Sequence, residues 1–175
     1  MLSFPRWPLF TAALAVFLIA KLLYAHASTA DVRFLLAPTN ALVSLLLNSA
    51  SEFEPARGYV HAGLRIVIDK SCAGGNFWLL SWLLFTFDYL HQSTRPPRAA
   101  VLLALPAASL GLTVLVNTAR IVGAVAVARA WPFGAPPAWL HEAQGALVYL
   151  FFLVVSHFGF LFLLSNSSSS RAHVA

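Results

Sequence analysis

The only cysteine of the chain, Cys72, lies where a polar segment meets a long apolar run. It is followed by Ala73-Gly74-Gly75, a stretch that offers little side-chain packing and exposes backbone N–H groups. A lone thiol can be a buried packing residue, since free cysteine is among the most buried residue types, or it can be a nucleophile. If a helix begins near Gly75, its positive N-terminal end points at the thiol and favours the thiolate.

Two further blocks place polar residues in apolar surroundings. Asn117 and Arg120 are three residues apart and share one face of an expected helix. An arginine near a bilayer boundary is costly and usually marks function, although a snorkelling arginine at a helix end is the alternative. His141 is expected at a helix N-terminus beside Glu142, where the helix end favours the neutral imidazole that a base needs. An interfacial histidine is the alternative there.

A thiol, a histidine and a fixed cation are the groups that acyl transfer requires. The thiolate attacks a peptide carbonyl, the histidine relays protons and the guanidinium stabilises the oxyanion. Gly74 and Gly75 would add backbone N–H donors. Among the other histidines, His61 in an expected outer loop is the only rival base, and His157 lies within an apolar run without an obvious partner.

The composition is that of an integral membrane protein. Of 175 residues, 59% are hydrophobic and only 10% are charged, and the apolar residues occur in long runs. The net charge of +5 is scattered at the ends of these runs without a basic stripe, so we expect no nucleic-acid partner. A single cysteine excludes an intramolecular disulfide and a cysteine-rich metal site, and no spaced His/Asp/Glu cluster occurs. We therefore expect no cofactor and no metal.

The apolar runs predict an all-α polytopic membrane protein with about four transmembrane helices, in one integral membrane domain over residues 1–164. The expected spans are about 7–25, 77–91, 99–116 and 141–164, and residues 117–130 continue the third span as a projecting or bent segment. The first run is interpreted as a retained helix and not as a signal peptide. The Ser-rich residues 165–175 are expected to form a disordered cytoplasmic tail.

The segment between the first two spans is less regular. Pro38 interrupts the apolar stretch over 32–50. Because the residue before a proline avoids helical geometry, we expect two short helices that lie on the outer surface or re-enter it. A full span over this stretch is the alternative. Residues 51–70 are polar, with β-like composition around Gly63, which predicts a small extramembrane turn or hairpin leading into Cys72.

The expected spans place the three chemical groups at one depth. The short loop with Arg95 and Arg98 is the clearest cytoplasmic segment under the positive-inside rule. With four spans, both termini are then cytoplasmic. Cys72, Arg120 and His141 all fall at the outer face of the membrane, although they are distant in the chain.

Three short blocks resemble the signature motifs of the exosortase/archaeosortase family, with the compact K-type exosortases as the most similar form. The blocks are Ser71-Cys72-Ala73-Gly74, Asn117-Thr118-Ala119-Arg120-Ile121, and His141 with Gly145 four residues on. The resemblance covers roughly residues 36–160, including the segment ahead of the cysteine. The chain departs from typical members in being short and in having fewer spans, which leaves its substrate signal open.

The resemblance implies a membrane-embedded cysteine protease or transpeptidase of the bacterial inner membrane, with its active site on the periplasmic face. Cys72 would be the nucleophile, Arg120 the transition-state stabiliser and His141 the proton shuttle. The implied partners are membrane lipid and exported proteins with a C-terminal sorting signal, whose new C-terminus passes to another acceptor. The competing class is a non-catalytic membrane subunit or a transporter component. In that class Asn117 and Arg120 would serve packing or ion contact.

Overall fold

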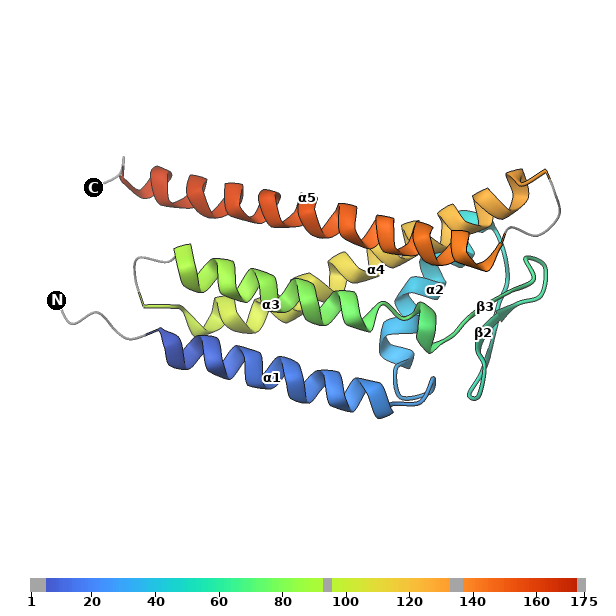
Figure 1. The fold of residues 1–175 in the computed structure, drawn as a ribbon, viewed down its shortest axis with the longest axis horizontal. Coiled ribbons are helices and arrows are strands. Elements are labelled where there is room, and N and C mark those ends of the chain that lie inside the picture. The colour runs from blue at the N-terminus through green and yellow to red at the C-terminus, as the bar shows by residue number, and fades with distance from the viewer. Residues whose placement is uncertain (1–5, 93–95, 133–136, 173–175) are drawn as a thin grey trace.

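A computed structural model describes the chain at residues 6–92, 96–132 and 137–172 (Figure 1). The described residues form five α-helices, one 3-10 turn (η1) and three short strands. In chain order they are α1 (Trp7–His26), α2 (Arg33–Leu47), β1 (Glu52–Glu54), β2 (Gly58–His61), β3 (Ile66–Ile68), η1 (Lys70–Cys72), α3 (Gly75–Gln92), α4 (Ala99–Ala130) and α5 (Ala138–Ala172).

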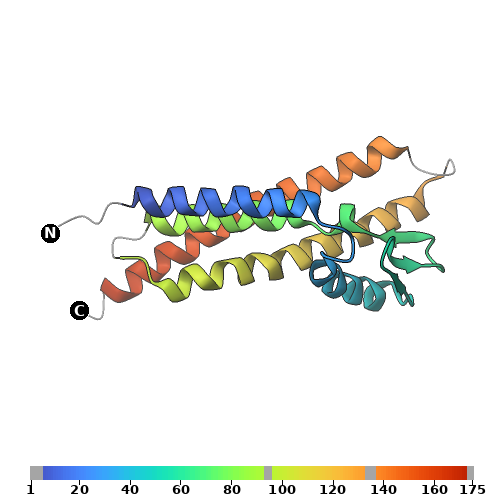
Figure 2. The same cartoon turned by 90° about the horizontal axis from the view of Figure 1, so that it is seen from below.

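The helices α1, α3, α4 and α5 run side by side along the long axis of the molecule (Figures 1 and 2). In the described part of the chain, three helices are long and apolar enough to cross a membrane: Trp7–His26, Ala99–Ala130 and Trp139–Asn166. In the most apolar 18-residue stretch of each helix, only 6% of the residues are buried in α1 and none in α5. Their large apolar side chains therefore face outward, where lipid would cover them. The expected class, a largely helical membrane protein, is confirmed.

Small polar residues lie in the interior of the bundle, beside buried apolar residues such as Phe77 and Leu105. Ser109, Thr113 and Asn117 are buried at a spacing of four along α4. The Thr113 hydroxyl donates to the Ser109 carbonyl at 2.7 Å, and the Thr86 hydroxyl in α3 donates to the Trp82 carbonyl at 2.8 Å. Since lipid provides no hydrophobic force between helices, close packing of small residues has to hold them together.

The bundle has two distinct ends. The start of α1, the end of α3, the start of α4 and the end of α5 lie at one end (Figure 1). At the opposite end lie α2, the three strands and η1, together with the neighbouring ends of the long helices; we call this the sheet end. Arg98, at the start of α4, lies at the end away from the sheet, whereas Arg95 lies outside the described residues.

Helix α2 is continuous, which corrects the expected break at Pro38. Its buried residues recur with helical spacing and face α4: Leu35, Leu36, Thr39, Asn40 and Val43. Burial of this face outweighs the local preference of the residue before a proline. Pro38 and Phe34, whose carbonyl loses its helical donor, are both exposed, so no orphaned group is buried there. At 15 residues, or about 22 Å, α2 is too short to cross a hydrocarbon core of about 30 Å.

The three strands form an antiparallel sheet in the order β1-β2-β3. The hairpin expected around Gly63 is confirmed as β2–β3, in which Val60 pairs with Val67, and β1 adds a third strand. His61 fixes this sheet to α2: its Nε2 lies 2.8 Å from Asn40 Oδ1, and its Nδ1 lies 3.1 Å from Ser49 Oγ.

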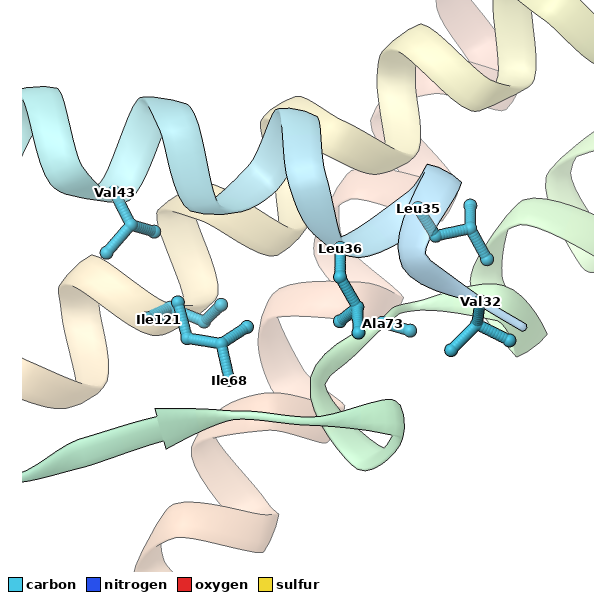
Figure 3. Close-up of a cluster of buried hydrophobic side chains, with 7 residues drawn as sticks. All are labelled: Val32, Leu35, Leu36, Val43, Ile68, Ala73 and Ile121. Atoms are coloured by element: carbon cyan, nitrogen blue, oxygen red, sulfur yellow. The ribbon is translucent and has the colours of Figure 1, made fainter. Parts of the chain in front are cut away.

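A buried hydrophobic cluster at the sheet end joins α2, β3, η1 and α4 (Figure 3). Its members are Val32, Leu35, Leu36, Val43, Ile68, Ala73 and Ile121. Ala73 follows Cys72 in the chain, and Ile121 follows Arg120. Because these two neighbours are buried, the backbone at Cys72 and at Arg120 is fixed in place.

Both last helices extend beyond the expected spans. Helix α4 continues past residue 116 to Ala130, about 48 Å in all, and carries its second half to the sheet end. Helix α5 continues through the serine-rich stretch to Ala172, which corrects the expected disordered tail over 165–172. The chain has no proline or glycine between Phe160 and Ala172, so nothing ends the helix earlier. Residues 173–175 lie outside the described part.

Candidate active site

Cys72 ends the 3-10 turn η1, three residues before α3 begins at Gly75, so the helix starts where the sequence predicts. Asp69 caps the turn: its Oδ1 accepts the Ser71 N–H at 2.9 Å and the Ser71 hydroxyl at 2.6 Å. The polar residues ahead of the cysteine therefore fold the chain into a tight turn that ends at Cys72.

Lys70 and Tyr24 fasten this turn to the end of α1. The Lys70 Nζ donates to the carbonyls of Ala25 and Ala27 at 2.9 and 2.6 Å, and so satisfies carbonyls at the C-terminal end of the helix. The Tyr24 hydroxyl donates to the Lys70 carbonyl at 3.1 Å. These hydrogen bonds fix the backbone next to Cys72, the candidate nucleophile, against the end of α1.

Cys72, Arg120 and His141 line one cavity of about 370 Å³ at the sheet end. They come from η1, from α4 and from the first turns of α5, in that order. The other lining residues are apolar: Ile66, Val67, Ile68, Ile121, Ala124, Val125 and Ala128. The structure therefore brings together the three residues that the spans had placed at one depth.

A chain of hydrogen bonds connects Arg120 to the backbone of Cys72. The Arg120 Nη1 donates to the Tyr149 hydroxyl at 3.4 Å, and its Cζ lies 5.3 Å from the centre of the Tyr149 ring. The Tyr149 hydroxyl donates to Asn117 Oδ1 at 2.8 Å, and Asn117 Nδ2 donates to the Cys72 carbonyl. Asn117 and Arg120 share one helix face, as their spacing predicts, because both contact the Tyr149 hydroxyl.

The guanidinium of Arg120 packs closely against α5. A Cβ added to Gly145 would stand 2.7 Å from Arg120 Nε, so any other residue at this position would force the Arg120 side chain to shift. The Gln144 Nε2 donates to the Arg120 carbonyl at 3.1 Å. The Arg120 Nε itself is buried and has no hydrogen-bond partner within the described residues, which leaves a donor without an acceptor beside the cavity.

The two glycines after the cysteine have a backbone role. Gly74 has φ +70°, and a Cβ there would stand 3.0 Å from Thr113 Cγ2. Gly74 and Gly75 are both buried, and neither is among the residues that line the cavity. They let the chain turn from η1 into α3 directly behind Cys72.

The histidines separate clearly by environment. His141 is exposed at the start of α5 and lines the cavity. His61, the rival base, is fully buried, does not line the cavity and contacts Asn40 and Ser49 through both ring nitrogens. Burial lowers the pKa of His61, because it disfavours the charged imidazolium.

His157 does have a partner, which the sequence did not reveal. Its Nδ1 lies 2.8 Å from Asp88 Oδ2, and this pair joins α5 to α3 in the half of the bundle away from the sheet. Because the two residues are 69 positions apart, no local pattern could have paired them.

Tyr149 is the site residue that sequence reasoning missed. It stacks on Phe77 with ring centres 5.2 Å apart and contacts both Asn117 and Arg120 through its hydroxyl. A signal was present: His141, Gly145 and Tyr149 recur every four residues, and so lie on one face of α5.

Comparison with protein-family models, with curated proteins and with solved structures finds no match to this chain. Among the described residues, no three His, Cys, Asp or Glu side chains lie close enough together to hold a metal ion. The function is therefore inferred from the residues that line the cavity.

Proposed function

We propose that the protein is a membrane-embedded cysteine endopeptidase or transpeptidase of the exosortase type. The observation that carries the proposal is the single cavity that Cys72, Arg120 and His141 all line, each from a different element. These are the nucleophile, oxyanion stabiliser and proton carrier of acyl transfer.

In the proposed reaction, the Cys72 thiolate attacks the carbonyl carbon of a peptide bond, and the new S–C bond leaves a negative oxygen that faces Arg120. When this intermediate collapses, the C–N bond breaks and the leaving amine takes a proton from the His141 imidazolium. The resulting thioester is attacked by water or by an acceptor nucleophile, which loses its proton to His141, and the thiolate is released.

The arrangement around Arg120 suits this role. Its side chain is confined by the Tyr149 ring and by Gly145, so the donors are oriented before charge develops. Its Nε is buried against α5, so an incoming oxygen would be bound by the terminal Nη groups, of which Nη1 also contacts Tyr149. A guanidinium also keeps its charge at any physiological pH.

We propose that α3 is a fourth membrane span. It is 18 residues, or about 27 Å, long and packs among α1, α4 and α5, although its polar ends lower its hydropathy. The sheet end then faces the periplasm of a bacterial inner membrane, with both termini inside. The proposed substrates are exported proteins that carry a C-terminal sorting signal.

The test is cleavage of a co-expressed exported protein that carries a candidate C-terminal signal, followed by its size shift. Cys72→Ala should abolish the shift, whereas Ala126→Ser on the exposed face of α4 should retain it. Both variants must accumulate in the membrane at the level of the unmodified protein. Full processing by Cys72→Ala would refute the reaction and favour a non-catalytic membrane subunit.

A further inference from the structure

One wall of the cavity is a strand. Ile66, Val67 and Ile68, the three residues of β3, all line it. Successive side chains of a strand point to opposite faces of the sheet. A space that touches all three residues therefore lies along the edge of the strand and not over one face of the sheet.

That edge of β3 is free of strand pairing. The sheet order is β1-β2-β3, so β3 is an edge strand whose pairing in the described chain is with β2 alone. An edge strand presents unpaired N–H and C=O groups, which are a template for one more strand. The other edge of the sheet, on β1, does not line the cavity.

The opposite wall is an apolar stripe of α4. Its members are spaced at three, four and seven residues, the repeat of one helix face: Ile121, Ala124, Val125 and Ala128. The two alanines leave room beside the strand, and none of the described residues that line the cavity carries a carboxylate. The free edge therefore faces an apolar wall, with the three chemical groups at the same cavity.

We propose that the substrate binds as an extended peptide along the free edge of β3, as a fourth strand of the sheet. Main-chain hydrogen bonds to β3 would hold it in register, and its alternate apolar side chains would pack on the α4 stripe. Its reacting carbonyl would lie at Cys72, four residues beyond Ile68. This inference rests on the proposed function, because it assigns how the peptide reaches that thiol.

The test uses peptides that react covalently with the thiol, on the purified full-length protein in lipid nanodiscs. The probe is acetyl-Val-Ala-Val-Ala chloromethyl ketone, compared with acetyl-Ala chloromethyl ketone and with iodoacetamide. Because the chain has one cysteine, intact mass reports alkylation of Cys72 directly. The four-residue probe should react at least about tenfold faster than the one-residue probe, since it can form strand hydrogen bonds worth roughly threefold to tenfold each.

The periodicity of the backbone contacts makes the test specific. A single N-methyl group placed at each residue of the probe in turn should slow alkylation about threefold to tenfold at alternate positions only, because every second N–H of a strand faces its neighbour. Ala128→Leu, which fills the cavity, should slow the four-residue probe, whereas Ala126→Leu on the same helix outside the cavity should not. Iodoacetamide should react equally with both variants.

The outcomes separate the two proposals. If iodoacetamide alkylates Cys72 but the longer probe has no advantage, or if N-methylation shows no alternation, strand addition is wrong while the reactive thiol stands. If the folded protein reacts with none of the three reagents, the proposed function fails and the docking of a peptide fails with it.

Discussion

Arg120 is surrounded by groups that restrict its position. The Tyr149 hydroxyl, the Tyr149 ring and the backbone at Gly145 limit it on the side of α5, while its own helix is held by the buried Ile121. A planar guanidinium is the side chain that such a site can orient, because its donors are fixed in one plane. The predictions for single residues follow from this geometry.

Arg120→Lys should lower the rate of processing about a hundredfold or more. Lysine keeps the charge but loses the planar fork, and loss of an oriented oxyanion donor costs on the order of 3 kcal/mol. The measurement is the rate of substrate cleavage at matched membrane levels. A variant with near-normal cleavage would show that charge alone is enough and that Arg120 does not act as an oriented donor.

Tyr149→Phe should lower the rate of processing about tenfold and leave the fold intact. The ring still stacks on Phe77, but the hydroxyl that connects Arg120 to Asn117 is lost. Tyr89→Phe is the matched control, because that hydroxyl accepts the Arg98 N–H at the far end of the bundle. Equal effects of the two variants on cleavage would contradict a positioning role for Tyr149.

At the scale of elements, the sheet is attached to α2 by a buried histidine. Burial lowers the pKa of His61, so the folded protein prefers the neutral ring and the unfolded chain binds more protons. This contribution to stability is fully present above the unfolded value of about 6.5 and is lost as the pH falls through the lowered folded pKa. Acidification should therefore weaken the attachment of the sheet to α2, which His61 makes through Asn40 and Ser49.

The thermal midpoint in detergent should fall as the pH is lowered from about 7.5 to 5, and His61→Gln should flatten part of that dependence. Glutamine keeps a donor and an acceptor without titrating. His141→Gln is the comparison, because it removes an exposed imidazole that does not join the sheet to α2. An identical profile for the His61 variant and the unmodified protein would rule out this role.

The pair between α3 and α5 is a second attachment between elements. Asp88 and His157 are 14% and 29% exposed in their side chains, so the cost of removing one partner is about 1 to 3 kcal/mol, below that of a fully buried pair. Asp88→Leu should therefore lower the thermal midpoint, and adding His157→Leu should recover most of the loss. Additive losses in the double variant would show that the two side chains do not interact.

At the scale of the whole molecule, a membrane-spanning α3 places the residues before and after it on opposite sides of the membrane. In a Cys72→Ser background, which has no other thiol, Ala56→Cys and Pro96→Cys place one label site on either side of α3. A membrane-impermeant maleimide should label position 56 in intact cells, and position 96 only after permeabilisation. Labelling of both positions from the same side would mean that α3 does not cross.

The polar residues and the lengths of the apolar runs were enough to predict much of the site. Run lengths determine depth in a bilayer, because about 20 apolar residues are needed to cross it, and so Cys72, Arg120 and His141 could be assigned to one level. The start of α3 at Gly75 and the hairpin around Gly63 also follow from local signals. Each of these features is determined by residues that lie close to it in the sequence.

Other features were decided only by tertiary packing. Helix α2 runs through Pro38 because its buried face packs on α4, a helix that begins more than 50 residues further along the chain. Tyr149 joins the site because α5 lies against α4, and His61 leaves it because the sheet buries the ring against α2. The conformational preferences of single residues are worth from a fraction of a kcal/mol to a few kcal/mol. They cannot determine such contacts, because the burial of several side chains outweighs them.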